Sequence, residues 1–206
     1  MLQTKTVHPT TLELLKKLQS IPLFKQLRLV GGTSLALQIG HRISVDLDLF
    51  GNLTADLQEI KQVLEKEQLQ FMLLHNTPSI HVFTINGIKV DIVNYPYPWL
   101  EMPFVVDNLS LANMKDIAAM KLSAITNRGT KKDFIDLYFL LQHFTLQQML
   151  DFYIARFDDS TLFPVIKSLS YFDDADSEPM PKMFIPTTWE EVKLKLTKVV
   201  ANIAGL

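Results

Sequence analysis

The chain of 206 residues is long enough for one large domain, or for one domain with a modest second lobe. Its 48% hydrophobic and 20% charged residues are typical of a folded globular protein, and the absence of cysteine excludes disulfides, thiolate zinc sites and cysteine nucleophiles. A net charge of −2 gives no global attraction to nucleic acid, and no segment has the apolar length of a signal peptide or a membrane span, which fits a cytoplasmic protein.

The first hundred residues combine helix and strand patterns. Thr10 and Glu13 have capping-box spacing, and Asn86-Gly87 has the chemistry of a type I′ hairpin turn. The expected elements are a helix over 11–19, a strand over 27–30, a diglycine turn, a helix over 33–39, a strand over 44–50, a helix from residue 54 or 55, and strands over 71–75, 80–85 and 88–93. This half is therefore predicted to be mixed α/β with hairpin pairing.

Beyond the proline-rich stretch that ends at Pro103, the pattern changes to helices. The expected helices cover 113–127, 131–144, 145–156 and 188–203, and the last two begin with the capping pairs Thr145 with Gln148 and Thr188 with Glu191. We therefore predict an α+β protein with a mixed sheet in an N-terminal lobe over 1–108 and a helical lobe over 109–206.

Two carboxylates lie on one face of an expected strand. Side chains alternate along a strand, so Asp46 and Asp48 point away from the leucines between and after them. Like charges at this spacing repel each other, and either water or a hard cation such as Mg²⁺ relieves the repulsion. By itself the pattern leaves both a solvated acidic strand and a metal site open.

A third carboxylate, Asp91, lies on a later strand, where Lys89 shares its face and apolar neighbours point the other way. If that strand pairs near the strand of Asp46 and Asp48, three carboxylates converge on one face of the sheet. Such a group suits two Mg²⁺ ions, of which one holds a triphosphate and the other activates an acceptor hydroxyl for in-line displacement.

A diglycine, Gly31-Gly32, precedes the helix expected from Thr33. Glycines let the backbone approach a ligand closely, and the free N–H groups at a helix start are suited to phosphate. Many strand-to-helix turns use glycine, so the motif gains weight only from its spacing of thirteen residues before Asp46.

These residues carry a family resemblance. An apolar residue, a diglycine, a spacer and then Asp-apolar-Asp-apolar resembles the signature of the DNA polymerase beta-like nucleotidyltransferase superfamily. Within it, "GGTSLALQIGHRISVDLDLF" is similar to the AbiEii/AbiGii family, the toxin half of bacterial toxin–antitoxin and phage-defence pairs. "DIAAMKLSAITNRGTKKDFIDLYFLL" resembles the second conserved block of that family, and "SLSYFDDADSEPMP" matches it more faintly.

The resemblance implies a polymerase-beta-like fold for the N-terminal lobe and a role for each matching residue. The phosphate-holding turn would be formed by Gly31, Gly32 and Thr33. The metals would be bound by Asp46, Asp48 and Asp91. The main departure from the family is that the chain is short, and this departure affects the helical part that would face the substrate.

In the second block, the resemblance implies that Lys121 contacts the nucleotide phosphates and that Asp133 or Asp136 matches the acidic motif. The residues themselves leave other readings open. Lys121 shares a helix stripe with apolar side chains and could instead reach past them to water. Asp133 and Asp136 could be partnered by Lys or Arg, or be favoured by the dipole at the start of their helix.

Other candidate residues are less specific. His41 and Arg42 precede the acidic strand, where they either face the carboxylates or form a surface pair. The basic turn over 128–132 could meet phosphate or RNA but favours solvent, as does the acidic loop over 173–178, which lacks the ligand spacing of a calcium loop.

We therefore hypothesise a Mg²⁺-dependent nucleotidyltransferase that moves a nucleoside monophosphate from an NTP to an acceptor hydroxyl on RNA such as tRNA, or on protein. Asp46 and Asp48 would be metal ligands, and Asp91 would be a ligand or would orient or deprotonate the acceptor. Lys121 would neutralise triphosphate charge. As a toxin, the protein would have a cognate antitoxin partner. The alternative is a catalytically silent protein that keeps the fold and binds nucleotides or a partner.

Overall fold

The computed structural model describes residues 1–157 and 161–204. The chain divides into two compact units, and neither is continuous in sequence. The first, which we call the sheet unit, comprises Met1–Ile39, Ser44–Pro96 and Pro103–Ala112. The second, the helical unit, comprises Gly40–Ile43, Tyr97–Met102 and Asn113–Leu206. The predicted α+β class with a mixed sheet is confirmed.

The sheet unit contains a seven-stranded sheet in the order β3-β4-β5-β2-β1-β7-β6. Its strands are β1 (Arg28–Leu29), β2 (Leu47–Gly51), β3 (Phe71–Asn76), β4 (Ile80–Ile85), β5 (Ile88–Asn94), β6 (Phe104–Val106) and β7 (Leu109–Leu111). Its helices are α1 (Pro9–Ser20), α2 (Gly31–Ile39) and α3 (Leu57–Lys66), with 3₁₀ turns at Thr4–Thr6 and Pro22–Phe24. Because β2 is parallel to β5 and antiparallel to β1, the sheet is mixed at its centre.

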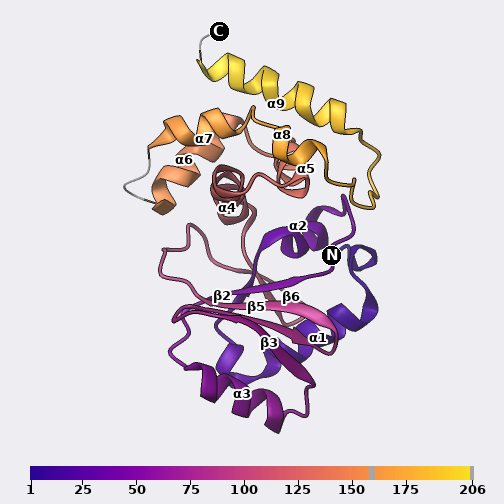
Figure 1. The fold of residues 1–206 in the computed structure, drawn as a ribbon, viewed down its shortest axis with the longest axis vertical. Coiled ribbons are helices and arrows are strands. Elements are labelled where there is room, and N and C mark those ends of the chain that lie inside the picture. The colour runs from indigo at the N-terminus through magenta and orange to yellow at the C-terminus, as the bar shows by residue number, and fades with distance from the viewer. Residues whose placement is uncertain (158–160, 205–206) are drawn as a thin grey trace. The chain divides into compact units, whose positions relative to one another are not determined.

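The hydrophobic core of the sheet unit lies between the sheet and the helices α1 and α3, which lie on the same side of it (Figure 1). Leu47 and Leu49 of β2 are fully buried there, as are Val90 and Ile92 of β5. Each such side chain contributes roughly 1.5 to 3 kcal/mol on burial. Because side chains alternate, this burial orients the acidic residues between them toward the opposite face.

Three local predictions were wrong. The N-cap of α1 is His8, whose ring accepts from the backbone amide of Thr10, because Pro9 takes the first helical position and moves the start ahead of the predicted Thr10 cap. Gly31 and Gly32 form the first turn of α2 and not a turn before it. The hairpin of β6 and β7 was missed in a region expected to become helical.

The Asn86-Gly87 turn is as predicted, since both residues have positive φ angles of 49° and 80°. The missed β6–β7 hairpin uses the same geometry at Asp107 and Asn108, with φ angles of 51° and 60°. Asparagine and aspartate tolerate this conformation better than most other residues, which is the signal the sequence did carry.

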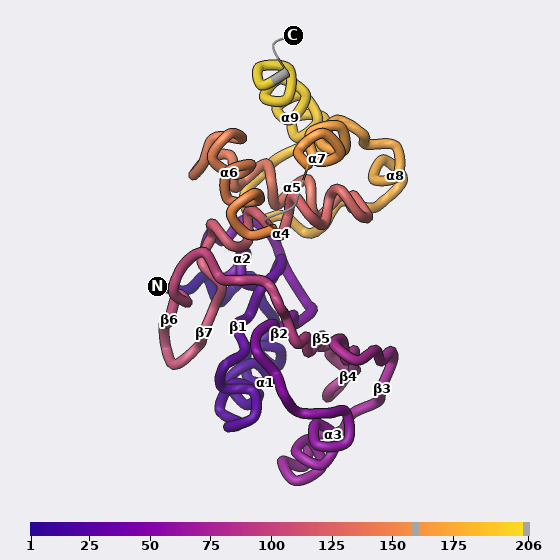
Figure 2. The backbone as a smooth tube through the Cα atoms, turned by 90° about the vertical axis from the view of Figure 1, so that its left-hand side faces the viewer, coloured from indigo at the N-terminus to yellow at the C-terminus, as the bar shows by residue number. Residues whose placement is uncertain are grey.

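The helical unit contains α4 (Met114–Asn127), α5 (Lys131–Leu140), α6 (Leu146–Phe157), α7 (Leu162–Ser168), α8 (Asp173–Asp176) and α9 (Trp189–Ala204). Within it, α4 packs against α5, α6 and α7, and α9 packs against α5 and α6 (Figure 2). The predicted capping pairs of Thr145 with Gln148 and of Thr188 with Glu191 are both formed. Across residues 1–157 and 161–204, no helix is both long and apolar enough to cross a membrane.

Candidate active site

Asp48 and Asp91 are neighbours on the face of the sheet opposite α1 and α3. They are register partners in the parallel ladder of β2 and β5, where strands lie about 4.8 Å apart. Asp46 lies two residues earlier, just before β2 begins, on the same face by alternation. The structure thus brings together the two strands on which the predicted carboxylates lie.

The start of α2 approaches Asp48 closely. The backbone amide of Val30 donates to the Asp48 carbonyl at 2.8 Å, and a Cβ added to Gly31 would clash with the Asp48 carboxylate oxygen. Gly31 also has a φ angle of 67°, which side-chain-bearing residues rarely adopt. The first amides of a helix have no carbonyl partner within it, so the helix start offers N–H groups and positive potential beside this carboxylate.

Thr33 fastens the residue that leads into β2. Its side chain is buried, and its hydroxyl lies 2.8 Å from that of Ser44 and donates to the carbonyl oxygen of Asp46. The Thr33 hydroxyl is therefore engaged with the protein, and only its backbone amide is suited to the predicted phosphate contact.

Lys89 supplies a cation on the acidic face. Its Nζ lies 2.7 Å from Asp91 Oδ1. Partial burial lowers the pKa of Lys89, but the hydrogen bond to Asp91 and the charges of Asp91, Asp48 and Asp46 outweigh it and raise the pKa above its ordinary value. All three predicted carboxylates therefore act on this ammonium. The sequence had shown only that Lys89 shares the face of Asp91.

The three predicted groups are all carboxylates, which are suited to a hard divalent cation, and Asp91 already binds the ammonium of Lys89. Within residues 1–157 and 161–204, however, no group of three or more acidic, histidine or cysteine side chains is gathered closely enough to hold a metal ion. Asp48 and Asp91, which are in register, are the pair best placed to share one.

Lys121, Asp133 and Asp136 form a buried ion cluster in the helical unit. Lys121 Nζ lies 2.8 Å from Asp133 Oδ1 and 2.6 Å from Asp136 Oδ2. Arg42 donates to both oxygens of Asp136, from Nε at 2.7 Å and from Nη2 at 2.8 Å, and His41 Nε2 lies 2.8 Å from Oδ1. Two earlier readings are wrong: Lys121 does not reach to water, and His41 and Arg42 are not a surface pair.

The charges of this cluster are strongly stabilised. Burial raises the pKa of Asp136, but the charges of Arg42 and Lys121 and the hydrogen bonds from His41 and Arg42 hold it well below its ordinary value. In the same way, Lys121 and Arg128 lower the pKa of Asp133 to about 2 against the effect of burial.

The two basic members of the cluster that can titrate respond in opposite directions. Burial lowers the pKa of Lys121, but the charges of Asp136 and Asp133 raise it above its ordinary value. Burial lowers the pKa of His41 and prevails over Asp136, so the ring is neutral and Nε2–H donates to the carboxylate.

Lys121, Asp133 and Asp136 are thus bound to one another and to basic neighbours, as one of the two readings of the aspartates expected. Their predicted contact with a nucleotide stays a prediction.

The basic turn and the acidic loop of the sequence bind each other. The backbone amide of Lys131 donates to Glu178 Oε2 at 2.8 Å, and its ammonium donates to the carbonyl oxygens of Asp176 and Glu178. Asp176 also accepts from Trp189 Nε1 at 2.6 Å. These contacts give both motifs a role in connecting α5, α8 and α9.

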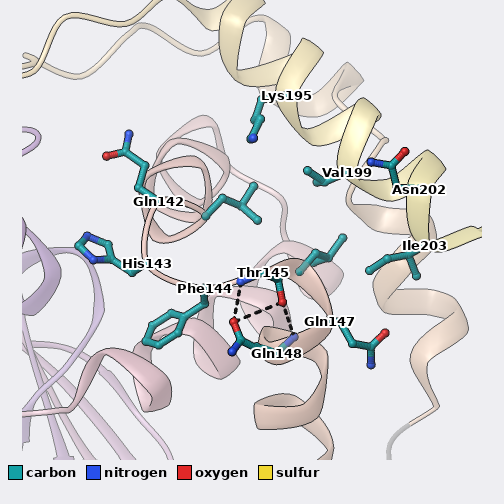
Figure 3. A pocket seen from close by; sticks show the side chains of 12 residues that line it. Gln142, His143, Phe144, Thr145, Gln147, Gln148, Lys195, Val199, Asn202 and Ile203 are labelled. Carbon is teal, nitrogen blue, oxygen red and sulfur yellow. Dashed lines mark hydrogen bonds between the residues drawn. The ribbon is translucent and has the colours of Figure 1, made fainter.

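A separate pocket of about 460 Å³ lies between the turn that joins α5 to α6 and the last turns of α9 (Figure 3). Figure 3 shows the capping pair Thr145 and Gln148 at its floor, with Lys195 and Asn202 on the side of α9. In the part of the chain that the structure describes, none of the residues predicted for the nucleotide site lines this pocket.

Comparisons with known proteins agree with the fold and the motifs. Residues 13–199 match the family described as nucleotidyl transferase AbiEii toxin, type IV TA system. An uncharacterised protein of Aquifex aeolicus (strain VF5) is 34% identical over 187 residues, which cover 88% of this chain and 89% of that protein.

Two solved structures have a similar fold. JHP933 from Helicobacter pylori has a TM-score of 0.59 at 19% identity, over 96% of this chain and 93% of that one. MenT4, a nucleotidyltransferase toxin from Mycobacterium tuberculosis H37Rv, has a TM-score of 0.53 at 14% identity, over 93% of this chain and 82% of that one. The chain is therefore a nucleotidyltransferase and belongs to the AbiEii toxin family of type IV toxin–antitoxin systems.

Proposed function

We propose that the protein transfers a nucleoside monophosphate from an NTP to an acceptor hydroxyl and releases pyrophosphate. The supporting observation is the in-register pair of Asp48 and Asp91, with the start of α2 at Gly31 against the Asp48 carboxylate. In the reaction, the acceptor oxygen forms a bond to the α-phosphorus, and the bond from that phosphorus to the pyrophosphate oxygen breaks. The catalytic lobe would correspond to residues 1–108.

In this proposal Asp46, Asp48 and Asp91 hold Mg²⁺, and the first amides of α2, at Gly31 and Gly32, bind phosphate oxygens. When bound, Mg²⁺ would neutralise triphosphate charge and favour deprotonation of the acceptor hydroxyl. Alternatively, Asp91, on the neighbouring strand, is not a ligand and instead orients that hydroxyl or accepts its proton.

The acceptor hydroxyl is proposed to belong to an RNA such as tRNA or to a protein. An antitoxin would be the partner that restrains the toxin, as its family implies. Because NTPs and these acceptors are abundant in the cytoplasm, we propose that compartment as the site of action.

Labelled NTPs test this function when they are offered singly with Mg²⁺, pooled tRNA or protein extract. The wild type should label one acceptor class, and Asp48→Asn should not. Asp107→Asn is the matched control, because Asp107 is an exposed turn residue of the same unit. Absence of both transfer and NTP binding in the wild type would refute the proposal, and growth arrest on induced expression that Asp46→Ala abolishes would support it.

One observation favours the alternative of a silent binding protein. Among the residues placed by the structure, the carboxylates are not gathered as a ready metal site, and Asp91 is paired with Lys89. That alternative predicts nucleotide binding which is unaffected by Asp48→Asn, and toxicity that survives the same substitution.

A further inference from the structure

Lys89 is anchored at the carboxylates while its side chain remains accessible. Its backbone is fixed by pairing with Thr84 of β4, two residues beyond the hairpin turn. Its ammonium lies 2.7 Å from Asp91 Oδ1, yet the side chain is 45% exposed, against 22% for Asp91. The hydrogen bond to Asp91 and the attraction of its charge therefore hold the tip of Lys89 where it is.

An ammonium and a divalent cation compete for such a carboxylate. Three carboxylates on one sheet face repel each other, and any cation among them offsets that repulsion. Two cations a few ångströms apart repel each other strongly in a partly desolvated site. We therefore expect a metal ion that binds Asp91 to displace the ammonium of Lys89 from Oδ1.

We propose that Lys89 is a resident counter-ion of the carboxylate site, which occupies Asp91 in the nucleotide-free protein and yields it to a divalent cation when a triphosphate enters. Phosphate oxygens are strong acceptors for a released ammonium, so the triphosphate compensates Lys89 for the loss of Asp91. Metal and nucleotide then bind cooperatively, and by linkage each strengthens the other by the same factor. This inference rests on the proposed function, because it takes the carboxylates as the metal site.

Titration of the protein with Mn²⁺, followed by the electron paramagnetic resonance of the free ion, tests the proposal. Without nucleotide, Lys89→Met should bind Mn²⁺ more tightly than the wild type by roughly fivefold, the factor expected for losing a competing, half-exposed ion pair. Lys89→Arg keeps the charge and should match the wild type. Lys25→Met, at an exposed position of the same unit, is the control for general charge.

A non-hydrolysable NTP analogue should tighten Mn²⁺ binding less in Lys89→Met than in the wild type, because the competing ammonium is already absent. In EDTA, Lys89→Met should also melt at a lower temperature than the wild type and recover when Mg²⁺ is added. Both measurements report on the counter-ion without any catalytic readout.

The outcomes separate this inference from the function on which it rests. If the wild type and Lys89→Met bind Mn²⁺ with equal affinity and Asp48→Asn does not bind it, the counter-ion role of Lys89 is refuted and the metal site is supported. No Mn²⁺ binding in the wild type even with nucleotide, or binding that survives Asp48→Asn, would overturn the metal site and this inference together.

Discussion

Asp136→Asn should strongly destabilise the helical unit. Asp136 is fully buried and accepts from Arg42, His41 and Lys121. Asparagine keeps the shape but removes the charge, which leaves Arg42 and Lys121 with Asp133 as the remaining carboxylate of the cluster. Removing one member of a buried ion pair costs about 3 to 5 kcal/mol, because the remaining charges stay buried without compensation.

Urea unfolding followed by tryptophan fluorescence measures this loss directly. The chain has two tryptophans, Trp99 and Trp189, and both belong to the helical unit, so their emission reports its unfolding. Asp151→Asn is the matched control, because Asp151 is an exposed residue of α6 that accepts from the side chain of Gln147. We expect this control to change the free energy of unfolding by less than about 0.5 kcal/mol.

The same variant tests whether Asp136 acts on the nucleotide. A loss of less than about 1 kcal/mol, in the range of an ordinary surface ion pair, would refute the structural argument for the cluster. If NTP affinity fell while the free energy of unfolding stayed near that of Asp151→Asn, the nucleotide-binding role implied by the family would account for Asp136 instead. Binding of a fluorescent NTP analogue supplies that second measurement.

Three further predictions concern single features. Gly31→Ala and Gly87→Ala should each cost about 1 to 2 kcal/mol in urea unfolding, because both glycines have positive φ. Only Gly31→Ala should also reduce nucleotide transfer, by about 100-fold, because its Cβ displaces the carboxylate of Asp48. A Cβ at Gly87 has no atom within 4 Å, so equal transfer in the two variants would contradict this reasoning. The pKa of Asp133 is lowered to about 2, so at pH values above its unfolded pKa Asp133 contributes about 2 kcal/mol to the free energy of unfolding. This contribution should be lost as the pH falls from about 4 to 2, and Asp133→Asn should flatten that part of the profile of stability against pH. Asp56→Ala removes the hydrogen bond that the Asp56 carboxylate accepts from the Glu59 amide in the α3 capping box, and it should cost about 1 kcal/mol without affecting NTP binding.

The carboxylate face was predictable from the sequence because strand alternation is a local property. The leucines around Asp48 and the apolar neighbours of Asp91 fixed which way each carboxylate points, and the structure buries those neighbours as expected. The pairing of β2 with β5 was only a condition of the prediction, since two strands separated by a helix and a hairpin can be arranged in several orders. The register that places Asp48 against Asp91 comes from tertiary structure.

The buried cluster shows the opposite limit. The sequence placed Lys121 on an apolar helix stripe, where a charge is costly, and this signalled that a partner was needed. It did not say which, because Asp136 lies on the next helix and Arg42 lies far away in the chain. The apolar surroundings that bury these helices also bury Lys121 and Asp136. A lysine on an apolar helix stripe is therefore compatible with a structural role and with a functional one.

Lys89 offsets part of the charge repulsion among the carboxylates on this face of the sheet. The sequence offered two ways to relieve their repulsion, namely water or a divalent cation, and the ion pair with Asp91 adds a third within the chain itself. Alternation put Lys89 on the correct face, but the choice of side-chain conformation that pairs it with Asp91 depends on the charges of β2 next to it. Because the ammonium offsets part of this repulsion, the face does not require a permanently bound metal. The carboxylates alone therefore do not distinguish an enzyme that binds the metal without nucleotide from one that binds metal and nucleotide together. The affinity of Lys89→Met for Mn²⁺ makes that distinction.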